Sequence, residues 1–460
     1  MRRIVGGPTI ARGAVIAVAV LALFSSTPVR GTPAAAPAEH VILVSIDGLM
    51  PAYYLEPDRY RLKIPTLREL MRTGVSFAGA EGVFPTVTYP SHTSIITGTL
   101  PAEHGIDSNT PFDPFNRTNG GWYWYAEDLR VPTLWDVVRQ GGKRTASVFW
   151  PVTVGARLDV NYPEYRTLAS DDDVKLLRAL ATPGLIDGIE KRYGRIPGRR
   201  PDDAVRASAA AYIIEHHRPN LLLVHLTDLD GAQHRSGPGS TEAVSTLEQI
   251  DGHLATIRHA LGQAGLLERT AWVVVSDHGF RSVSRQFHPR VVLRESGYLT
   301  YDAKGALTDW RVDARIAGGT FALVAKDPAD REAVEGVTRQ FRALAADPRF
   351  GLARIYSPAE IRDNGGFPDA FLAGEAADDF MVGGATAGDV VTASTSKGMH
   401  GYHPSRADQL SALLLSGAGV VSGQRQDRAR LIDVAPTVAR LLGVEMPSAR
   451  GKVLNQVIKN

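Results

Sequence analysis

Three predicted strands of this chain run into an acidic residue, and this recurrence is the strongest chemical signal in the sequence. Asp47 follows one apolar run, Asp230 lies just beyond a second, and Asp277 ends a third. In open parallel sheets ligands bind at the carboxyl ends of strands, so we expect these side chains to converge in space. His278 adjoins Asp277, and His234 lies four residues after Asp230. Carboxylates and imidazoles in these positions can hold a metal ion.

Each of these features alone also has a structural explanation. An aspartate at a strand end is often a turn or helix cap. The glycine of Asp277-His278-Gly279 permits a bend that turns both side chains toward one metal, and Asp230 and His234 could share a metal from one helical turn. His400 stands between glycines in Gly398-Met399-His400-Gly401-Tyr402, which is typical of a close backbone approach. A histidine there could equally lie on the surface.

A threonine near a helix start adds a candidate nucleophile. The segment from Phe84 to Thr93 leads into an apolar helical stretch, and Pro90 suits the first helical turn. Thr88 is then expected just before the helix N-terminus, where free backbone N–H groups favour a phosphate. The structural alternative is that Thr88 only caps the helix.

Composition narrows the chemistry and the location. The chain has 460 residues and no cysteine, so a metal site must be built from Asp, Glu and His. Its net charge of +2 gives no broad basic surface, and no stable nucleic-acid partner is indicated. Arg2 and Arg3 precede the apolar run Ala14 to Phe24 and a Pro/Ala-rich stretch, so residues 1–38 are predicted to be a signal peptide and linker. An uncleaved anchor is the alternative, and both place the protein in a secreted or periplasmic location.

Alternating strand-like and helix-like segments must position these residues, and they predict an α/β fold of three layers: a mostly parallel central sheet with helices on both faces. The buried strands are expected at His40 to Ile46, Leu221 to Leu226, Ala271 to Ser276 and Gln409 to Ser416. The helices are expected at Pro65 to Thr73, Val131 to Gly141, Pro201 to His217, Thr241 to Ala264 and Leu431 to Leu442.

A long segment between His278 and His400 has elements of its own, and we expect a small α+β cap subdomain at residues 285–396 within a catalytic domain of residues 39–460. Its expected elements are a strand at Gly319 to Ala325, a helix within Pro328 to Ala346 and a strand at Ala353 to Tyr356. The Gly/Ala/Asp-rich segment Gly374 to Gly388 is expected to be a mobile loop, because it has little to bury.

Taken together, these segments resemble the type I phosphodiesterase/nucleotide pyrophosphatase branch of the alkaline phosphatase superfamily. The motifs occur in the family's order along the whole chain after the signal. They are Asp47-Gly48, Pro85 to His92, Thr97-Gly98 with His104-Gly105-Ile106 leading to Asn109, Asp230 with His234, Asp277-His278-Gly279, and His400-Gly401-Tyr402. The resemblance implies the alkaline-phosphatase-like fold and a metal-dependent phosphoric ester hydrolase.

The resemblance also implies a ligand set and a nucleophile. One zinc ion would be held by Asp230, His234 and His400, and a second by Asp47, Asp277, His278 and the Thr88 oxygen. Thr88 would attack phosphorus and form a covalent phospho-threonine. Asn109 would donate its amide to a phosphoryl oxygen, although a turn asparagine is the alternative.

The sequence predicts the substrate less sharply than the fold or the ligand set. Nucleotide-hydrolysing members of the family commonly carry Glu-Pro-Asp where this chain has Asp228-Leu229-Asp230, and often an aromatic residue where His225 stands. Tyr89 could stack on a base or could simply pack in the core. We expect a small phosphodiester or nucleotide-like substrate. A phosphomonoesterase or phosphonate hydrolase on the same scaffold is the alternative, and a non-catalytic binding protein is a third.

Overall fold

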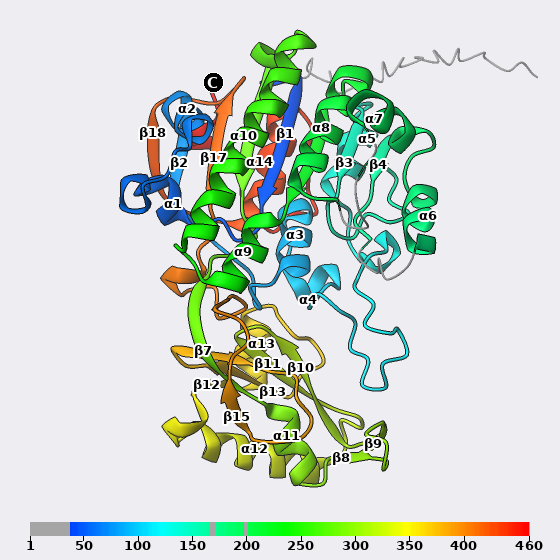
Figure 1. Cartoon of the computed structure of the whole chain (residues 1–460), viewed down its shortest axis with the longest axis vertical. Helices are drawn as coiled ribbons and strands as arrows, with labels where there is room; N and C mark the ends of the chain where they lie inside the picture. Colours follow the sequence, from blue (N-terminus) through cyan, green and yellow to red (C-terminus); the bar gives the residue numbers. More distant parts are fainter. Residues whose placement is uncertain (1–36, 166–170, 195, 197–200, 460) are drawn as a thin grey trace, which may run out of the picture. The chain divides into compact units, whose positions relative to one another are not determined.

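The computed structural model describes residues 37–165, 171–194, 196 and 201–459 (Figure 1). Nearly all of the predicted signal and linker, residues 1–38, lies outside the described residues, so that assignment stays a prediction. Within the described part of the chain, no helix has the length and apolar character needed to cross a membrane.

An eight-stranded sheet forms the centre of the fold, in the order β18-β2-β17-β6-β1-β5-β3-β4. The strands are β1 (His40–Ile46), β2 (Gly74–Glu81), β3 (Thr145–Val148), β4 (Val160–Tyr162), β5 (Leu221–Leu226), β6 (Thr270–Val275), β17 (Leu413–Gly417) and β18 (Gln424–Arg430). Only β17 runs antiparallel to its neighbours in this sheet. The four strands expected from the sequence are therefore adjacent, in the order β17-β6-β1-β5.

Helices cover both faces of this sheet because its strands are apolar on both sides. On β1, Ile42 and Val44 pack into one core and Val41 and Leu43 into the other. The first core is closed by α2 (Pro65–Thr73), α8 (Asp203–His217) and α10 (Thr241–Gln263), and the second by α3 (Thr88–Thr97), α5 (Leu134–Gln140) and α14 (Val434–Leu441). The expected three-layer α/β fold is thus confirmed (Figure 1).

The segment between His278 and His400 builds a separate antiparallel sheet in the order β10-β11-β13-β12, drawn in green to orange in Figure 1. Its strands are β10 (Val312–Ala317), β11 (Thr320–Ala325), β12 (Leu352–Tyr356) and β13 (Leu372–Ala376). Helix α12 (Arg331–Ala345) packs Phe341 against Phe321 of β11, with ring centroids 5.5 Å apart. The expected strand–helix–strand series is present, while the limits 285–396 of a cap subdomain stay a prediction.

The expected mobile loop at Gly374 to Gly388 is wrong for its first half. Strands β13 and β14 (Asp379–Val382) occupy it, and Phe380 and Val382 are buried in the core of the insertion. A Cβ atom on Gly374 would lie 2.3 Å from the Phe321 ring, so the small residue is required by close packing. The glycine and alanine content therefore indicates tight contact between strands, not a lack of anything to bury.

The remaining elements connect these layers. They are α1 (Pro51–Leu55), α4 (Pro101–His104), α6 (Asp171–Leu180), α7 (Leu185–Tyr193), α9 (Asp228–Ser236), α11 (Pro289–Glu295), α13 (Pro358–Asp363), β7 (Arg281–Phe287), β8 (Leu299–Tyr301), β9 (Leu307–Trp310), β15 (Val391–Ala393) and β16 (Gly398–Met399). Short 3-10 helices complete the chain trace.

Candidate metal centre

The carboxyl ends of three adjacent strands deliver the predicted acidic residues to one place. Strands β5, β1 and β6 lie in parallel register, with Ser45 of β1 beside both His225 and Val275. Asp47 follows β1, Asp277 follows β6, and Asp230 lies in the first turn of α9 after β5. Sequence-distant side chains therefore meet at this edge of the sheet, as a parallel sheet requires.

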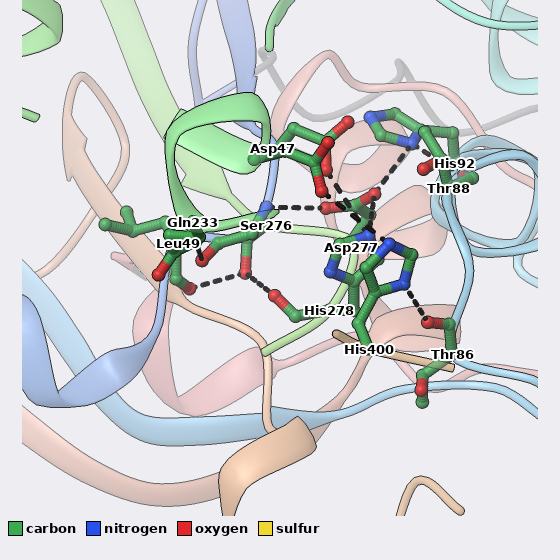
Figure 2. A network of polar contacts seen from close by, with 12 residues as sticks. Asp47, Leu49, Thr86, Thr88, His92, Gln233, Ser276, Asp277, His278 and His400 are labelled. Atoms are coloured by element: carbon green, nitrogen blue, oxygen red, sulfur yellow. Dashed lines mark hydrogen bonds and ion pairs between the residues drawn. The ribbon is translucent and has the colours of Figure 1, made fainter. Parts of the chain in front are cut away.

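Asp47, Asp277 and His278 form what we call the inner group (Figure 2). His278 Nε2 lies 3.3 Å from Asp47 Oδ1 and 3.1 Å from Asp277 Oδ2. The other oxygen of Asp277 accepts a hydrogen bond from the Gly48 backbone N–H at 3.1 Å. All three side chains are at most 2% exposed, so the inner group belongs to the interior of the protein.

Asp230, His234 and His400 form the outer group. Asp230 Oδ1 lies 3.2 Å from His234 Nε2, one helical turn away on α9, and 3.6 Å from His400 Nε2. His400 stacks on His278 with ring centroids 3.5 Å apart, and the potential ligand atoms of Asp230, His278 and His400 also converge. His278 therefore lies between the two groups. Asp230 and His234 are 22% and 27% exposed, so this half of the cluster is open to solvent.

The three histidines of the cluster are fixed in the same way. Each Nδ1 lies within hydrogen-bond distance of a backbone carbonyl: Gly398 for His234, Gly279 for His278 and Thr86 for His400. An Nδ1–H bond of this kind leaves Nε2 as the lone-pair nitrogen that binds a metal. Each Nε2 points at a carboxylate of the cluster, so the imidazoles are oriented as ligands.

The donor set fits cations. Among the described residues, the buried atoms Asp47 Oδ1, Asp230 Oδ1, Asp277 Oδ2 and His278 Nε2 have no hydrogen-bond partner. Burial, followed by the nearby Asp277 and Asp230 carboxylates, raises the pKa of Asp47 to about 7. Buried carboxylates crowded in this way are unfavourable unless positive charge is supplied. Oxygen and imidazole donors without thiols suit zinc or a similar divalent ion.

Thr88 and Asn109 lie next to this cluster. Thr88 is the first residue of α3 and is buried, and its carbonyl is 2.8 Å from Nδ1 of His92. His92 Nδ1 also lies 3.6 Å from Asp277, on the side of the cluster where Figure 2 draws Thr88. The Tyr89 backbone N–H donates to Asn109 Oδ1 at 2.9 Å, which leaves the Asn109 NH₂ group as a donor for another acceptor.

Tyr89, the predicted substrate-binding residue next to Thr88, belongs to the core in this structure. It is 0% exposed and packs edge-on against Trp122 at 5.1 Å. This contact is that of the packing alternative, and a contact with substrate stays a prediction.

Sequence reasoning missed two buried groups behind Asp47. His225 Nε2 lies 3.0 Å from Asp47 Oδ2, and its Nδ1 lies 3.7 Å from Glu164. Burial lowers the pKa of His225, but the hydrogen bonds and charges of Asp47 and Glu164 outweigh this effect and raise it to about 9. A histidine inside an otherwise apolar strand was the available signal.

Four further histidines could support the ligands. His104 is 3.0 Å from Ser94, His288 is 3.0 Å from Thr392, and His403 is 2.9 Å from Asn364. Of these four, His92 is the one with a contact to an inner-group residue among the described contacts.

A three-layer α/β fold gathers carboxylates and imidazoles at the carboxyl edge of its sheet, beside a helix that begins with a threonine, and this is the arrangement of an α/β protein with a candidate metal site. A family model for type I phosphodiesterase / nucleotide pyrophosphatase matches residues 41–403. Because this match covers most of the chain, the protein belongs to the type I phosphodiesterase/nucleotide pyrophosphatase family, a family of phosphoric ester hydrolases. The resemblance drawn from the motifs is confirmed.

Individual relatives are more distant. Ectonucleotide pyrophosphatase/phosphodiesterase family member 1 from Homo sapiens is 25% identical over 263 residues, which cover 55% of this chain and 24% of the relative. Bis(5'-adenosyl)-triphosphatase enpp4 from Xenopus laevis is 25% identical over 279 residues, which cover 59% of this chain and 54% of the relative. The chain thus spans about a quarter to half the length of these curated relatives.

Solved structures show the same fold. An inactive form of murine ectonucleotide pyrophosphatase/phosphodiesterase 5, in complex with AMP, has a TM-score of 0.65 and 19% identity. The likeness covers 92% of this chain and 100% of that chain. The human protein of the same name gives a TM-score of 0.65 at 20% identity.

Proposed function

We propose that this protein is an exported two-zinc phosphodiesterase or nucleotide pyrophosphatase that uses Thr88 as its nucleophile. The observation that carries the proposal is the juxtaposition of the inner and outer groups with the first turn of α3. The family membership supports the same chemistry. Export is supported by the signal-like composition of residues 1–38.

The two groups divide the ligands of the two ions. Asp47, Asp277, His278 and the Thr88 oxygen would hold one ion, and Asp230, His234 and His400 the other. Bound zinc supplies Lewis-acid stabilisation of negative charge on the attacking, leaving and phosphoryl oxygens. The buried oxygen atoms without hydrogen-bond partners support this assignment.

The chain's own groups position the reaction. The Thr88 hydroxyl lies at the N-terminus of a ten-residue helix, where backbone N–H groups and the helix dipole favour the anionic phosphoryl group. Thr88 Oγ1 forms a bond to phosphorus as the bond from phosphorus to the leaving oxygen breaks. The Thr88 proton goes to solvent, and the leaving alcohol takes a proton from solvent. Water then cleaves the phospho-threonine and releases the phosphate product.

Asn109 would donate its NH₂ group to a non-bridging phosphoryl oxygen. Its other end is already held by the Tyr89 backbone N–H, so the orientation of the amide is set before substrate binds. A fixed donor aimed at developing charge stabilises the transition state without reorganisation.

The substrate class we propose is a small phosphodiester or nucleotide-like pyrophosphate. One relative is named for the hydrolysis of a dinucleoside triphosphate, and AMP is bound in a structural neighbour. The balanced net charge of +2 favours a small anion held locally over a long nucleic acid.

Bound metal and hydrolysis, measured on the same purified protein, test the proposal. We expect about two zinc ions per chain, with nitrophenyl phosphodiester turnover lost on chelation and restored by zinc. A panel of mono-, di- and pyrophosphates should show the diester or pyrophosphate preferred. A rate insensitive to chelation would refute the metal mechanism, and a strong preference for a monoester or phosphonate would establish the alternative activity.

A further inference from the structure

Four neighbouring strands converge on one side of the inner group. In the sheet order β1-β5-β3-β4, each strand contributes one polar group at or just beyond its carboxyl end. These groups are the Asp47 carboxylate, the His225 imidazole, the Phe149 carbonyl and the Glu164 carboxylate. The series follows the sheet order from β1 to the edge strand β4.

His225 is fixed from both sides. Its Nε2 lies 3.0 Å from Asp47 Oδ2, while its Nδ1 lies 3.3 Å from the Phe149 carbonyl and 3.7 Å from Glu164 Oε2. The His92 ring packs against it at 4.1 Å. With an oxygen atom facing each ring nitrogen, the imidazole has one favourable orientation.

In this arrangement the two carboxylate oxygens of Asp47 face different groups. Oδ2 faces His225, whereas buried Oδ1 has no hydrogen-bond partner among the described residues and lies 3.3 Å from His278 Nε2. A hydrogen bond to one carboxylate oxygen fixes the rotation of the group and directs the other oxygen toward a metal. Asp277 is held similarly, by the Gly48 backbone N–H.

Glu164 has no place in the predicted ligand set, yet it is fully buried. A buried carboxylate is retained at a cost unless it interacts with positive charge or hydrogen-bond donors. Glu164 Oε2 lies 3.7 Å from His225 Nδ1. Glu164 therefore faces one edge of the imidazole, while the other edge faces Asp47 Oδ2.

We propose that His225, supported by Glu164, is a positioning residue that sets the Asp47 carboxylate for the inner metal and thereby determines the affinity of the inner metal position. The inference rests on the proposed two-zinc function, because it assigns a role toward one of the two ions. A purely structural pair would contribute to folding but leave zinc affinity unchanged.

Zinc binding by folded variants tests this role. We compare His225→Phe, which removes both nitrogens, His225→Gln, which keeps an N–H donor, and Glu164→Gln. The matched control is His40→Phe, because His40 is also buried, lies at the opposite end of β1 and bonds to the Pro219 carbonyl just before β5. Each variant is also made in a His234→Ala background, where the outer group is disabled and the inner position can be followed alone.

The expected result is a weaker inner position in competition titrations of zinc against a chelator. His225→Phe should raise the zinc dissociation constant of that position by about 10- to 100-fold. The change should be smaller for His225→Gln and Glu164→Gln and absent for His40→Phe. Excess zinc should restore much of the kcat of His225→Phe with KM little changed.

Two outcomes distinguish a failure of the positioning role from a failure of the proposed two-zinc function. A wild-type protein that binds no zinc overturns the proposed function itself. If the wild type binds two ions and the His225 variants bind them equally well, only the positioning role is overturned. Should His225→Phe fail to fold, His225→Gln and Glu164→Gln decide the matter by the same titration.

Discussion

The inner and outer groups of the metal centre use similar ligands but are built differently. The inner group stands on strand ends of the central sheet and is at most 2% exposed. The outer group is carried by α9 and by the 398–402 loop, with Asp230 and His234 22% and 27% exposed. Strand ends held by neighbours on both sides move little, whereas a solvent-facing helix turn can adjust. For the proposed two-zinc site, the difference predicts a rigid inner metal position and a more exchangeable outer one.

The largest expected effect is the loss of an inner-group carboxylate, and it is compared with the loss of an outer-group carboxylate. Asp277→Asn should lower kcat/KM on a nitrophenyl phosphodiester by on the order of a thousandfold, equal to about 4 kcal/mol of activation free energy. It removes one of the two inner-group carboxylates that face buried His278, and the carboxylate 3.6 Å from His92. Asp230→Asn should cost only about tenfold to a hundredfold, because water can reach the vacated position. Equal losses would break the comparison.

Graded chelation should separate the two positions without mutation. Because the outer group is partly exposed, its ion should be removed first, and the loss of zinc should occur in two steps of about one ion per chain. Elemental analysis at increasing chelator concentration, with hydrolysis measured in parallel, checks the order. In His234→Ala, the first step should be missing. A single step that removes both ions would show that the positions are equivalent.

A glycine substitution tests whether the position of His400 in the outer group depends on its contacts with the segment between His278 and His400. Gly401 has φ of +90°, and a Cβ atom there would lie 2.2 Å from the Ala317 carbonyl of β10. Gly401→Ala should therefore cost about 1–3 kcal/mol of stability, measured by urea unfolding, and weaken zinc binding at His400. Gly384→Ala is the control, since a Cβ atom there meets nothing within 4 Å. If both variants unfold at the same urea concentration, the 398–402 loop tolerates displacement.

The effect furthest from catalysis concerns acid stability at helix α3. Helix α3 carries Thr88, and its Ser94 bonds to buried His104, whose pKa is lowered by burial to about 3. A histidine kept neutral by folding contributes stability above its unfolded pKa near 6.5. That contribution falls by about 1.4 kcal/mol per pH unit as pH drops from there toward 3. His104→Gln should make unfolding free energy less steep in pH between 6 and 4, and an unchanged slope would contradict the assignment.

The sequence predicted the fold well because the relevant signals are local. β1, β5 and α2 have the expected limits, since continuous apolar runs and a proline at the helix start define them. The convergence of Asp47, Asp230 and Asp277 followed from the geometry of parallel sheets alone. The end of α14 at Leu441, before Gly443 with φ of +70°, likewise follows from backbone freedom at a helix end.

What could not be predicted depends on contacts between distant segments. Nothing local distinguishes Glu164 as the partner of His225. Glu164 follows β4 and His225 lies on β5, and only the sheet order brings these two strands close together. The contact of Tyr89 with Trp122 could not be predicted, because the direction of a side chain on α3 depends on how the helix packs. The strands within Gly374 to Gly388 were missed because small residues fit both loops and tight sheets.

Thr86, two residues before Thr88, is hydrogen-bonded to His400, Gly401 and Tyr402 at the end of the segment between His278 and His400. Its carbonyl lies 3.0 Å from His400 Nδ1, and its hydroxyl accepts from the Gly401 N–H and donates to the Tyr402 carbonyl. A variant in which the segment between His278 and His400 is replaced or shortened would have to keep these three hydrogen bonds. Recombination points for chimeric enzymes should be chosen on the insertion side of Gly398.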